Sequence, residues 1–149
     1  MAAIIAGTLE ELSSRQVHDL YKLRVDVFVA EQATPYAEID EEDTTATHLL
    51  AYDGEQIVGC GRCMFTPDRM QFGRFVVTPS ARGTGVSREI MDFAMQLAGE
   101  RELYLTAQQA LVPYYQRYGF EPVGELYDDT GVPHQPMLRP APGQGSKQQ

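Results

Sequence analysis

The sequence has no tryptophan, only two cysteines, and far fewer basic than acidic residues. Two cysteines are too few for the disulfide framework of a small secreted domain. Lys and Arg number 12 and Asp and Glu 21, so the formal net charge is -9. A charge of this sign opposes binding to DNA or RNA, and we expect no nucleic-acid partner. It fits a cationic substrate, although solubility alone would also explain it.

Long apolar runs are also missing. No window approaches the ~18–20 consecutive apolar residues of a membrane span, and the first residues lack the basic region of a secretory signal. We therefore expect a cytoplasmic protein without a membrane partner. The 149 residues, 43% of them hydrophobic, suit one compact domain. We place that domain at 1–139 and predict a disordered tail at 140–149, where Pro, Gly and polar residues predominate.

The two cysteines, Cys60 and Cys63, form a C-x-x-C pattern of the kind found in redox centres and zinc sites. The surrounding segment, QIVGCGRCMF, indicates a strand, in which residues three apart point to opposite faces. Their Cα atoms would lie about 10 Å apart, beyond the roughly 7 Å limit of a disulfide. No second cysteine pair completes a zinc site, so we expect two reduced cysteines and no metal.

Hydrophobic periodicity predicts alternating strands and helices. A short apolar strand comes first, followed by an amphipathic helix that Ser13 and Gln16 cap and that extends to about Val29. After a loop come three strands, the first two joined by an Asp53-Gly54 hairpin turn. A helix, a strand, a short helix and two final strands complete the chain. This order indicates a mixed α/β or α+β domain.

The loop after the first helix is long and acidic. Five of its residues between Glu38 and Asp43 are acidic, and they show no apolar periodicity. We expect them either to attract a cationic acceptor or to form a solvated surface. Arg74 is a cation inside an apolar strand and needs a carboxylate partner, for which we expect Glu31 or Asp40.

A strand runs through Thr78-Pro79 and a glycine-rich turn directly into the second long helix. Backbone N–H groups in such a turn converge on an anion, aided by the positive end of the helix dipole. Arg82 adds charge, and Gly83 and Gly85 allow close approach. A plain tight turn would explain the glycines alone. The sequence lacks both the Walker pattern and the three glycines of a dinucleotide fingerprint.

The string V-x-P-x-x-R-G-x-G-V, from Val77 to Val86, resembles the acetyl-coenzyme A signature of the GNAT superfamily of N-acetyltransferases. Ser87 stands where that signature has Gly or Ala. Tyr115, four residues before Gly119-Phe120, resembles a second landmark of the superfamily. Further segments, among them LRVDVFVAEQATPYAEIDEED and GVPHQPM, resemble its bacterial ElaA-like branch, so the resemblance covers almost the whole chain except the tail.

The resemblance implies a GNAT-like fold with a central mixed sheet of six to seven strands, splayed in the middle and flanked by about four helices. It implies that acetyl-coenzyme A lies between the strand ending at Val77 and the strand 103–107. The residues that would bind it are Phe75, Val76, Val77, Arg82, Gly83, Thr84, Gly85, Val86, Ser87, Gln108 and Tyr115.

The implied reaction moves acetyl from acetyl-coenzyme A to a primary amine by direct attack in a ternary complex. A backbone N–H near Val76 or Val77 would polarise the thioester carbonyl, and Tyr115 would protonate the departing thiolate. Glu31 is the first candidate for the general base, with His48 and His134 as alternatives. The residues expected at the acceptor are Glu31, Tyr36, Arg74 and His134.

Two other functions remain open at this point. The same fold could serve as a non-catalytic acyl-coenzyme A sensor or interaction module, since both motifs bear on cofactor binding more directly than on catalysis. A redox protein would require a reducible bond between Cys60 and Cys63. The sequence leaves the amine acceptor undetermined, and a homodimer is compatible with it.

Overall fold

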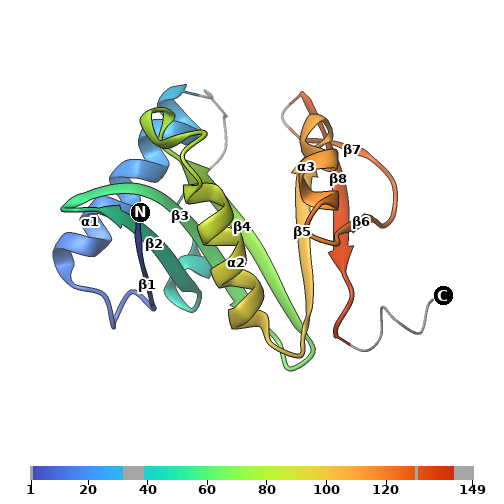
Figure 1. Cartoon of the computed structure of the whole chain (residues 1–149), viewed down its shortest axis with the longest axis horizontal. Coiled ribbons are helices and arrows are strands. Elements are labelled where there is room, and N and C mark those ends of the chain that lie inside the picture. The colour runs from blue at the N-terminus through green and yellow to red at the C-terminus, as the bar shows by residue number, and fades with distance from the viewer. Residues whose placement is uncertain (1, 32–38, 130, 143–149) are drawn as a thin grey trace. The chain divides into compact units, whose positions relative to one another are not determined.

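The computed structural model describes residues 2–31, 39–129 and 131–142. It contains eight strands in one sheet, in the order β1-β2-β3-β4-β5-β8-β6, with β7 paired to β8 (Figure 1). The strands are β1 Ala3–Gly7, β2 Thr47–Asp53, β3 Gln56–Phe65, β4 Arg69–Val77, β5 Glu102–Gln108, β6 Glu121–Pro122, β7 Tyr127–Asp129 and β8 Val132–Arg139. The described residues form three α-helices, α1 Ser14–Arg24, α2 Val86–Ala98 and α3 Val112–Gln116.

Short helical segments complete the architecture: a π-helix η1 Val25–Glu31 and three 3-10 turns, η2 Glu41–Thr44, η3 Pro79–Ala81 and η4 Gln109–Leu111. The mixed α/β fold class is therefore confirmed, with eight strands rather than six to seven and three α-helices rather than about four. The predicted disorder of the tail concerns mainly residues 143–149, which lie outside the described residues.

The chain divides into two compact units. Unit 1 comprises Met1–Met64 and Gly73–Leu97, and unit 2 comprises Phe65–Phe72 and Ala98–Gln149. The boundary inside β4 lies next to Arg74, whose φ of 48° is unusual for a residue other than glycine.

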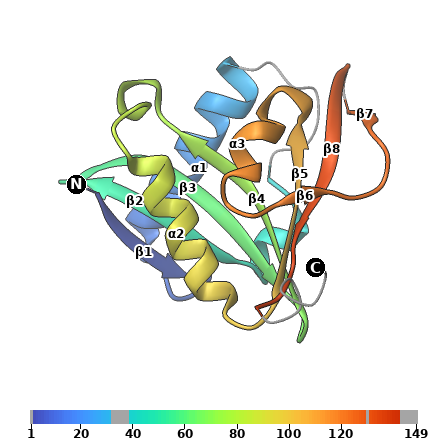
Figure 2. The same ribbon diagram turned by 45° about the vertical axis from the view of Figure 1, so that its right-hand side comes forward.

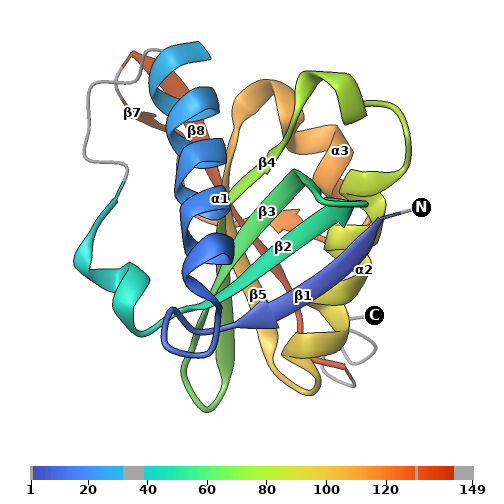
Figure 3. The ribbon, with the colours of Figure 1, turned by 90° about the vertical axis from the view of Figure 1, so that its left-hand side faces the viewer.

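In unit 1, α1 and α2 pack on opposite faces of the strands (Figures 1 and 3). On the α1 face, Leu20 and Leu23 of the helix form a buried cluster with Leu50, Cys60 and other apolar residues. Gly59, which precedes Cys60 in β3, faces α2, because a Cβ built there would contact Ile90 and Val86. The alternation of side chains along β3 thus gives each helix its own apolar surface.

The expected helix boundaries are confirmed at the start of α1 and revised at its end. The Ser13 hydroxyl accepts from the Gln16 N–H and the Gln16 side chain accepts from the Ser13 N–H, which is the predicted capping box. The α-helix ends at Arg24 and continues as the π-helix η1, so regular α-helical bonding stops before Val29. Wide turns of this kind are rare and often accompany functional sites.

In unit 2, β8 pairs antiparallel with β5, and β6 and β7 both pair with β8 (Figure 2). We expected one strand before the last, and the structure has two, β6 and β7. The reason is local: the segment turns at Gly124, with φ 70°, and the Gln135 side chain donates to the carbonyls of Val123 and Gly124 at 3.2 and 3.3 Å. Those carbonyls therefore have a side-chain donor in place of a strand partner.

Both cysteines are free and buried in β3, as expected. Cys60 pairs in register with Leu50 and Cys63 with Thr47, which fixes the strand geometry that separates them. Burial raises the pKa of Cys63 to about 12, so the thiol is protonated and unreactive at neutral pH. A redox role for the pair is therefore excluded by geometry.

Candidate functional site

The segment between β4 and α2 has the geometry of an anion-binding turn. Gly83 and Gly85 adopt φ values of 81° and 95°, a region that side chains disfavour. A Cβ at either position would meet nothing within 4 Å, so the glycines are required by the backbone conformation and leave the space above the turn open. The first N–H groups of α2 follow directly and have no acceptor within the helix.

Hydrogen bonds hold this turn in place. The Arg82 Nε donates to the Val77 carbonyl at 3.0 Å, which ties the turn to the end of β4. The Thr84 hydroxyl donates to the Ala81 carbonyl, and the Thr84 N–H donates to the same oxygen at 3.2 Å. The Thr78 N–H donates to the Val58 carbonyl at 2.9 Å. The turn is thus held in shape by hydrogen bonds within the protein.

The strand end that precedes the turn includes the predicted pantetheine contacts Phe75, Val76 and Val77. Val76 and Val77 are buried, and Val76 belongs to the apolar cluster beneath α1. Just before them, Arg74 has its positive φ, and its carbonyl accepts from the Cys60 thiol at 3.5 Å. The turn and this strand end all lie in unit 1, so most of the predicted cofactor residues belong to one compact unit.

The remaining cofactor candidates, Gln108 and Tyr115, and the acceptor candidate His134 lie in unit 2. Tyr115 is buried and packs edge-on against Tyr114 and Phe120, with ring centroids 5.1 and 6.1 Å away. Burial, and to a smaller extent the neighbouring Tyr114 and Tyr118, raise the pKa of Tyr115 above its ordinary value. Its phenol is therefore protonated at neutral pH and able to donate a proton.

Gln108 ends β5 and is exposed, and His134 lies opposite it in β8. Two other acceptor candidates have no described side chain: Glu31 ends η1 with its side chain outside the described residues, and Tyr36 lies wholly outside them. His48 is fully buried and its Nε2 lies 3.0 Å from the Asp43 carbonyl, so this alternative general base has no access to a substrate.

A buried ionic cluster in unit 1 was not predicted as such. It consists of Arg24, Asp40, Asp43, Arg62 and Arg74. Arg62 Nη1 donates to Asp40 Oδ1 at 2.8 Å and to Asp43 Oδ1 at 3.1 Å. Arg74 Nη2 donates to Asp40 Oδ2 at 3.2 Å, which confirms Asp40 as the partner expected for Arg74. The cluster connects α1, β3 and β4 to the acidic loop.

The cluster corrects the interpretation of that loop. Asp43 is only 1% exposed, and its Oδ2 also accepts from the Asp40 N–H at 3.1 Å. Asp43 therefore neutralises the interior Arg24 and Arg62 and does not face a substrate or solvent. Asp40, 30% exposed, pairs with Arg62 and Arg74 at the edge of the cluster. Glu41 and Glu42 are exposed, which is compatible with both alternatives. The sequence contained one indication of this cluster. Arg24 follows Leu20 by four residues and so lies on the apolar stripe of α1, where an arginine needs a buried partner.

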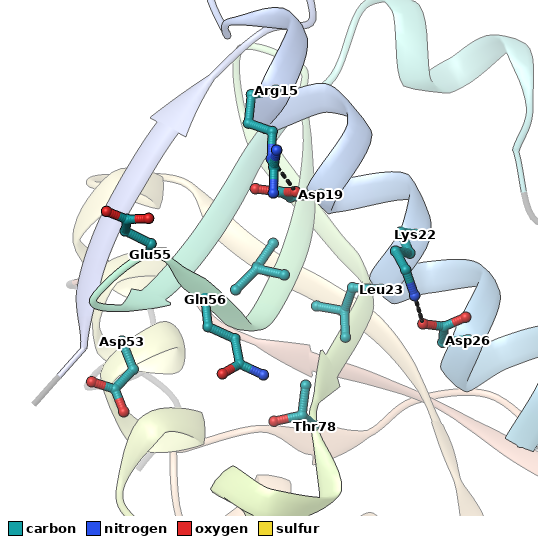
Figure 4. Close-up of a pocket in the computed structure, with 10 residues that line it drawn as sticks. Arg15, Asp19, Lys22, Leu23, Asp26, Asp53, Glu55, Gln56 and Thr78 are labelled. Carbon is teal, nitrogen blue, oxygen red and sulfur yellow. Dashed lines mark hydrogen bonds and ion pairs between the residues drawn. The ribbon is translucent and has the colours of Figure 1, made fainter.

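A groove of about 610 Å³ lies in unit 1 between α1, the β2–β3 hairpin and Thr78 (Figure 4). Two ion pairs form its helical wall, Arg15 with Asp19 at 3.1 Å and Lys22 with Asp26 at 2.8 Å. The other lining residues are Leu23, Asp53, Glu55, Gln56, Ile57 and Thr78. Of the sequence-predicted site residues whose side chains are described, none lines it, although Thr78 directly follows Val77.

Within the described ranges, no group of three or more His, Cys, Asp or Glu side chains is arranged to hold a metal ion. Among those same residues, no helix is both long and apolar enough to cross a membrane.

Comparisons with known proteins agree with this geometry. The family profile described as "Acetyltransferase (GNAT) domain" matches residues 8–139. Protein ElaA of Escherichia coli is 35% identical over 138 residues, covering 87% of this chain and 90% of that protein. The "Uncharacterized N-acetyltransferase YjcF" of Bacillus subtilis is 35% identical over 144 residues, covering 93% of this chain and 99% of YjcF.

Solved structures extend the comparison. An acyl-CoA N-acyltransferase from Pseudomonas aeruginosa superposes with a TM-score of 0.88 at 32% identity, covering 93% of this chain and 99% of that one. The crystal structure of Escherichia coli ElaA gives a TM-score of 0.87 at 32% identity over the same shares. A match that spans nearly the whole fold, together with the turn at Arg82–Ser87, means that this chain belongs to the GNAT acetyltransferase family.

Proposed function

We propose that this protein transfers acetyl from acetyl-coenzyme A to a primary amine by direct attack within a ternary complex. Membership of the GNAT family implies an acyl-coenzyme A donor and an acceptor. The observation that carries the proposal is the turn before α2, where two glycines with positive φ leave open space beside the helix N-terminus. That arrangement suits the pyrophosphate of a coenzyme A ester.

The proposed cofactor contacts begin at this turn and extend to β4 and β5. The pyrophosphate would rest on the backbone from Arg82 to Ser87, with the Arg82 charge beside it. The pantetheine would pair with the backbone at Phe75, Val76 and Val77 as an added strand, and Gln108 would supply an amide contact. Ser87 and Gln108 are departures from the common family pattern, and both keep small or polar side chains that allow these contacts.

The chemistry requires a polarised thioester carbonyl, a proton for the departing thiolate and a neutral amine. A backbone N–H at Val76 or Val77 would stabilise the developing oxyanion. Tyr115 would protonate the thiolate, which its protonated phenol allows. Glu31, Tyr36 and Arg74 remain predictions on the acceptor side, and Glu31 and His134 are the two candidates for the proton acceptor.

Thermal unfolding with and without acetyl-coenzyme A tests the cofactor site. Ligand at a hundredfold excess over its Kd adds about 2.7 kcal/mol, and each kcal/mol is worth roughly 2–4 °C for a chain of this size. We expect a shift of several degrees that falls in Arg82→Ala and is retained in Arg15→Ala, a matched change on the exposed face of α1. No shift at millimolar ligand would refute the proposal.

A panel of primary amines, with detection of released thiol, then tests transfer. Acceptor-dependent thiol release supports the transferase, and comparison of acetyl with longer acyl-coenzyme A esters tests donor choice. Binding without release from any amine would favour the non-catalytic sensor instead. We expect the reaction to occur in the cytoplasm. Sedimentation of the purified protein tests whether it forms the homodimer that the sequence allows.

A further inference from the structure

His134 occupies a central position in unit 2. It lies in β8, where it pairs in register with Gln108 of β5 on one side and with Tyr127 of β7 on the other. The Tyr127 ring lies against the imidazole, with centroids 5.9 Å apart and planes tilted by 30°. The histidine is therefore held on both sides by neighbouring strands, next to a residue proposed to contact the cofactor.

The two faces of this small sheet differ. Leu105 and Ala107 of β5 and Met137 of β8 are buried, and so are Tyr115 and Phe120. Figure 2 shows α3 against one face of β5, so this helix covers the apolar side. The alternate residues, including Gln108 and His134, project from the opposite face. Tyr115 and His134 therefore belong to opposite sides of the β5–β8 ladder.

The hydrogen bond of His134 determines which nitrogen carries its proton. Nδ1 lies 2.9 Å from the Val132 carbonyl oxygen, which only accepts hydrogen bonds. In the neutral ring the proton is therefore on Nδ1, and Nε2 carries the lone pair. A neutral imidazole fixed in this tautomer by a backbone carbonyl is suited to take up a proton at Nε2.

We infer that His134 is the general base of the proposed transfer, with Nε2 accepting the proton of the attacking amine. This inference rests on the proposed function. The amine binds as its ammonium ion and loses one proton to Nε2, and the neutral nitrogen then bonds to the acetyl carbon. The carbon–sulfur bond breaks, Tyr115 gives its proton to the thiolate, and the second nitrogen proton leaves to water. Exchange with water restores both side chains. Because His134 and Tyr115 belong to opposite sides of the β5–β8 ladder, the group that takes the proton of the amine and the group that protonates the thiolate are distinct.

His134→Asn is the informative variant, because the Asn amide still donates to the Val132 carbonyl in place of Nδ1–H but has no group to accept a proton. Its kcat/KM at neutral pH should fall by roughly 10²-fold or more. Its acetyl-coenzyme A thermal shift should match that of the wild type. His18→Asn, a matched change at an exposed position of α1, should alter neither quantity.

The pH dependence separates catalysis from structure. With the amine that wild type uses best, the deficit of His134→Asn should shrink as pH rises and the amine loses its own proton. Ethylamine and trifluoroethylamine give a second readout at constant pH, because fluorination makes the amine less basic. The variant should discriminate against ethylamine more strongly than wild type does.

The outcomes distinguish this inference from the proposed function. A loss that is equal at every pH and for both amines would mean that His134 only supports the structure, and a loss below about threefold would remove it from the mechanism. If Glu31→Gln, and not His134→Asn, loses kcat/KM at neutral pH and regains it at high pH, then Glu31 is the base and the assignment to His134 is wrong. Wild type that binds acetyl-coenzyme A but releases thiol with no amine refutes the transferase itself.

Discussion

Arg24 and Asp43 form a two-pronged ion pair in the interior of unit 1. Arg24 Nη1 donates to Asp43 Oδ1 at 2.8 Å and Nη2 donates to Oδ2 at 3.2 Å, with side chains 0% and 1% exposed. The pair joins the end of α1 to η2, 19 residues later in the chain. The pair therefore holds Asp43, in the part of the acidic loop that the structure describes, against α1.

Asp43→Asn should destabilise the protein strongly. The amide is nearly isosteric, but it leaves Arg24 and Arg62 buried without their shared negative charge. Breaking a buried pair in this way costs about 3–5 kcal/mol, which corresponds to a fall in Tm of roughly 6–20 °C. Asp92→Asn removes an exposed helical pair with Arg88 and should change the free energy of unfolding by less than about 1 kcal/mol. Equal Tm values for the two variants would contradict this account.

Stability should fall as pH drops below neutrality, because of His48. Burial, followed by the nearby Arg24 and Arg62 charges, holds the pKa of His48 below its ordinary 6.5. Below pH 6.5 the unfolded chain therefore binds a proton that the folded chain does not, and stability falls by up to about 1.4 kcal/mol per pH unit. Urea unfolding between pH 7 and 5 should show this slope, and His48→Gln should reduce it. An unchanged slope in His48→Gln would rule out His48 as its source.

A second loss of stability, caused by protonation of Asp43, should follow in stronger acid. Burial alone would raise the pKa of Asp43, but hydrogen bonds from Arg24, the Asp40 N–H and Arg62 together lower it below its ordinary 3.8. Its contribution to stability is therefore present above pH 3.8 and disappears as pH falls through the lower folded-state value. Acid unfolding followed by circular dichroism should lose this component in Asp43→Asn and retain it in Asp92→Asn.

Local features of this fold could be predicted from the sequence, whereas long-range polar pairing could not. The Ser13–Gln16 cap, the Asp53-Gly54 turn and the Gly83–Gly85 turn each depend on residues within a few positions of one another. The Arg24–Asp43 pair depends on how a loop closes over a helix, and nothing in the spacing of its residues specifies that partner. An arginine on an apolar helical stripe indicates that a buried partner exists, but not which carboxylate it is.

The candidate site also contains one part that the sequence predicted and one part that depends on the folded structure. The anion-binding turn was predicted because glycines, an arginine and a helix start follow one another along the chain. The tautomer of His134 depends on the Val132 carbonyl, and its ring lies against Tyr127 of β7, a separate strand in a segment where the sequence had indicated a single one. Gln135 separates β6 from β7 by bonding to the carbonyls of Val123 and Gly124, a contact made only after folding.

Gly59→Ala should destabilise unit 1 by pushing α2 away from β3. The added Cβ would lie 2.8 Å from Ile90 Cδ1 and 3.2 Å from the Val76 carbonyl oxygen. Overpacking of this kind costs about 1–3 kcal/mol. Ile90→Val removes the methyl group at 2.8 Å; it costs about 0.5–1.5 kcal/mol alone and should cost less, or restore stability, when combined with Gly59→Ala.

Gly73→Ala is the matched control for that experiment, because a Cβ there would meet nothing within 4 Å and its φ is not positive. We expect its unfolding free energy to stay within about 0.5 kcal/mol of wild type. Urea denaturation of wild type, Gly59→Ala, Ile90→Val and the double variant gives the coupling free energy between Gly59 and Ile90. Strictly additive effects of the two changes would mean that Ile90 is not the side chain that the added Cβ crowds.

Tyr115→Phe should lower kcat by roughly 10²–10⁴-fold while leaving the Kd for acetyl-coenzyme A nearly unchanged. The phenyl ring keeps the edge-on contacts with Tyr114 and Phe120, so Tm should hardly move. Because burial raises the pKa of Tyr115 above 10, the wild-type kcat should also show no loss from its ionisation between pH 7 and 10. Tyr118→Phe, which removes the hydroxyl that lies 3.3 Å from that of Tyr114, is the control and should retain most activity. A loss below about threefold in Tyr115→Phe would mean that another group protonates the thiolate.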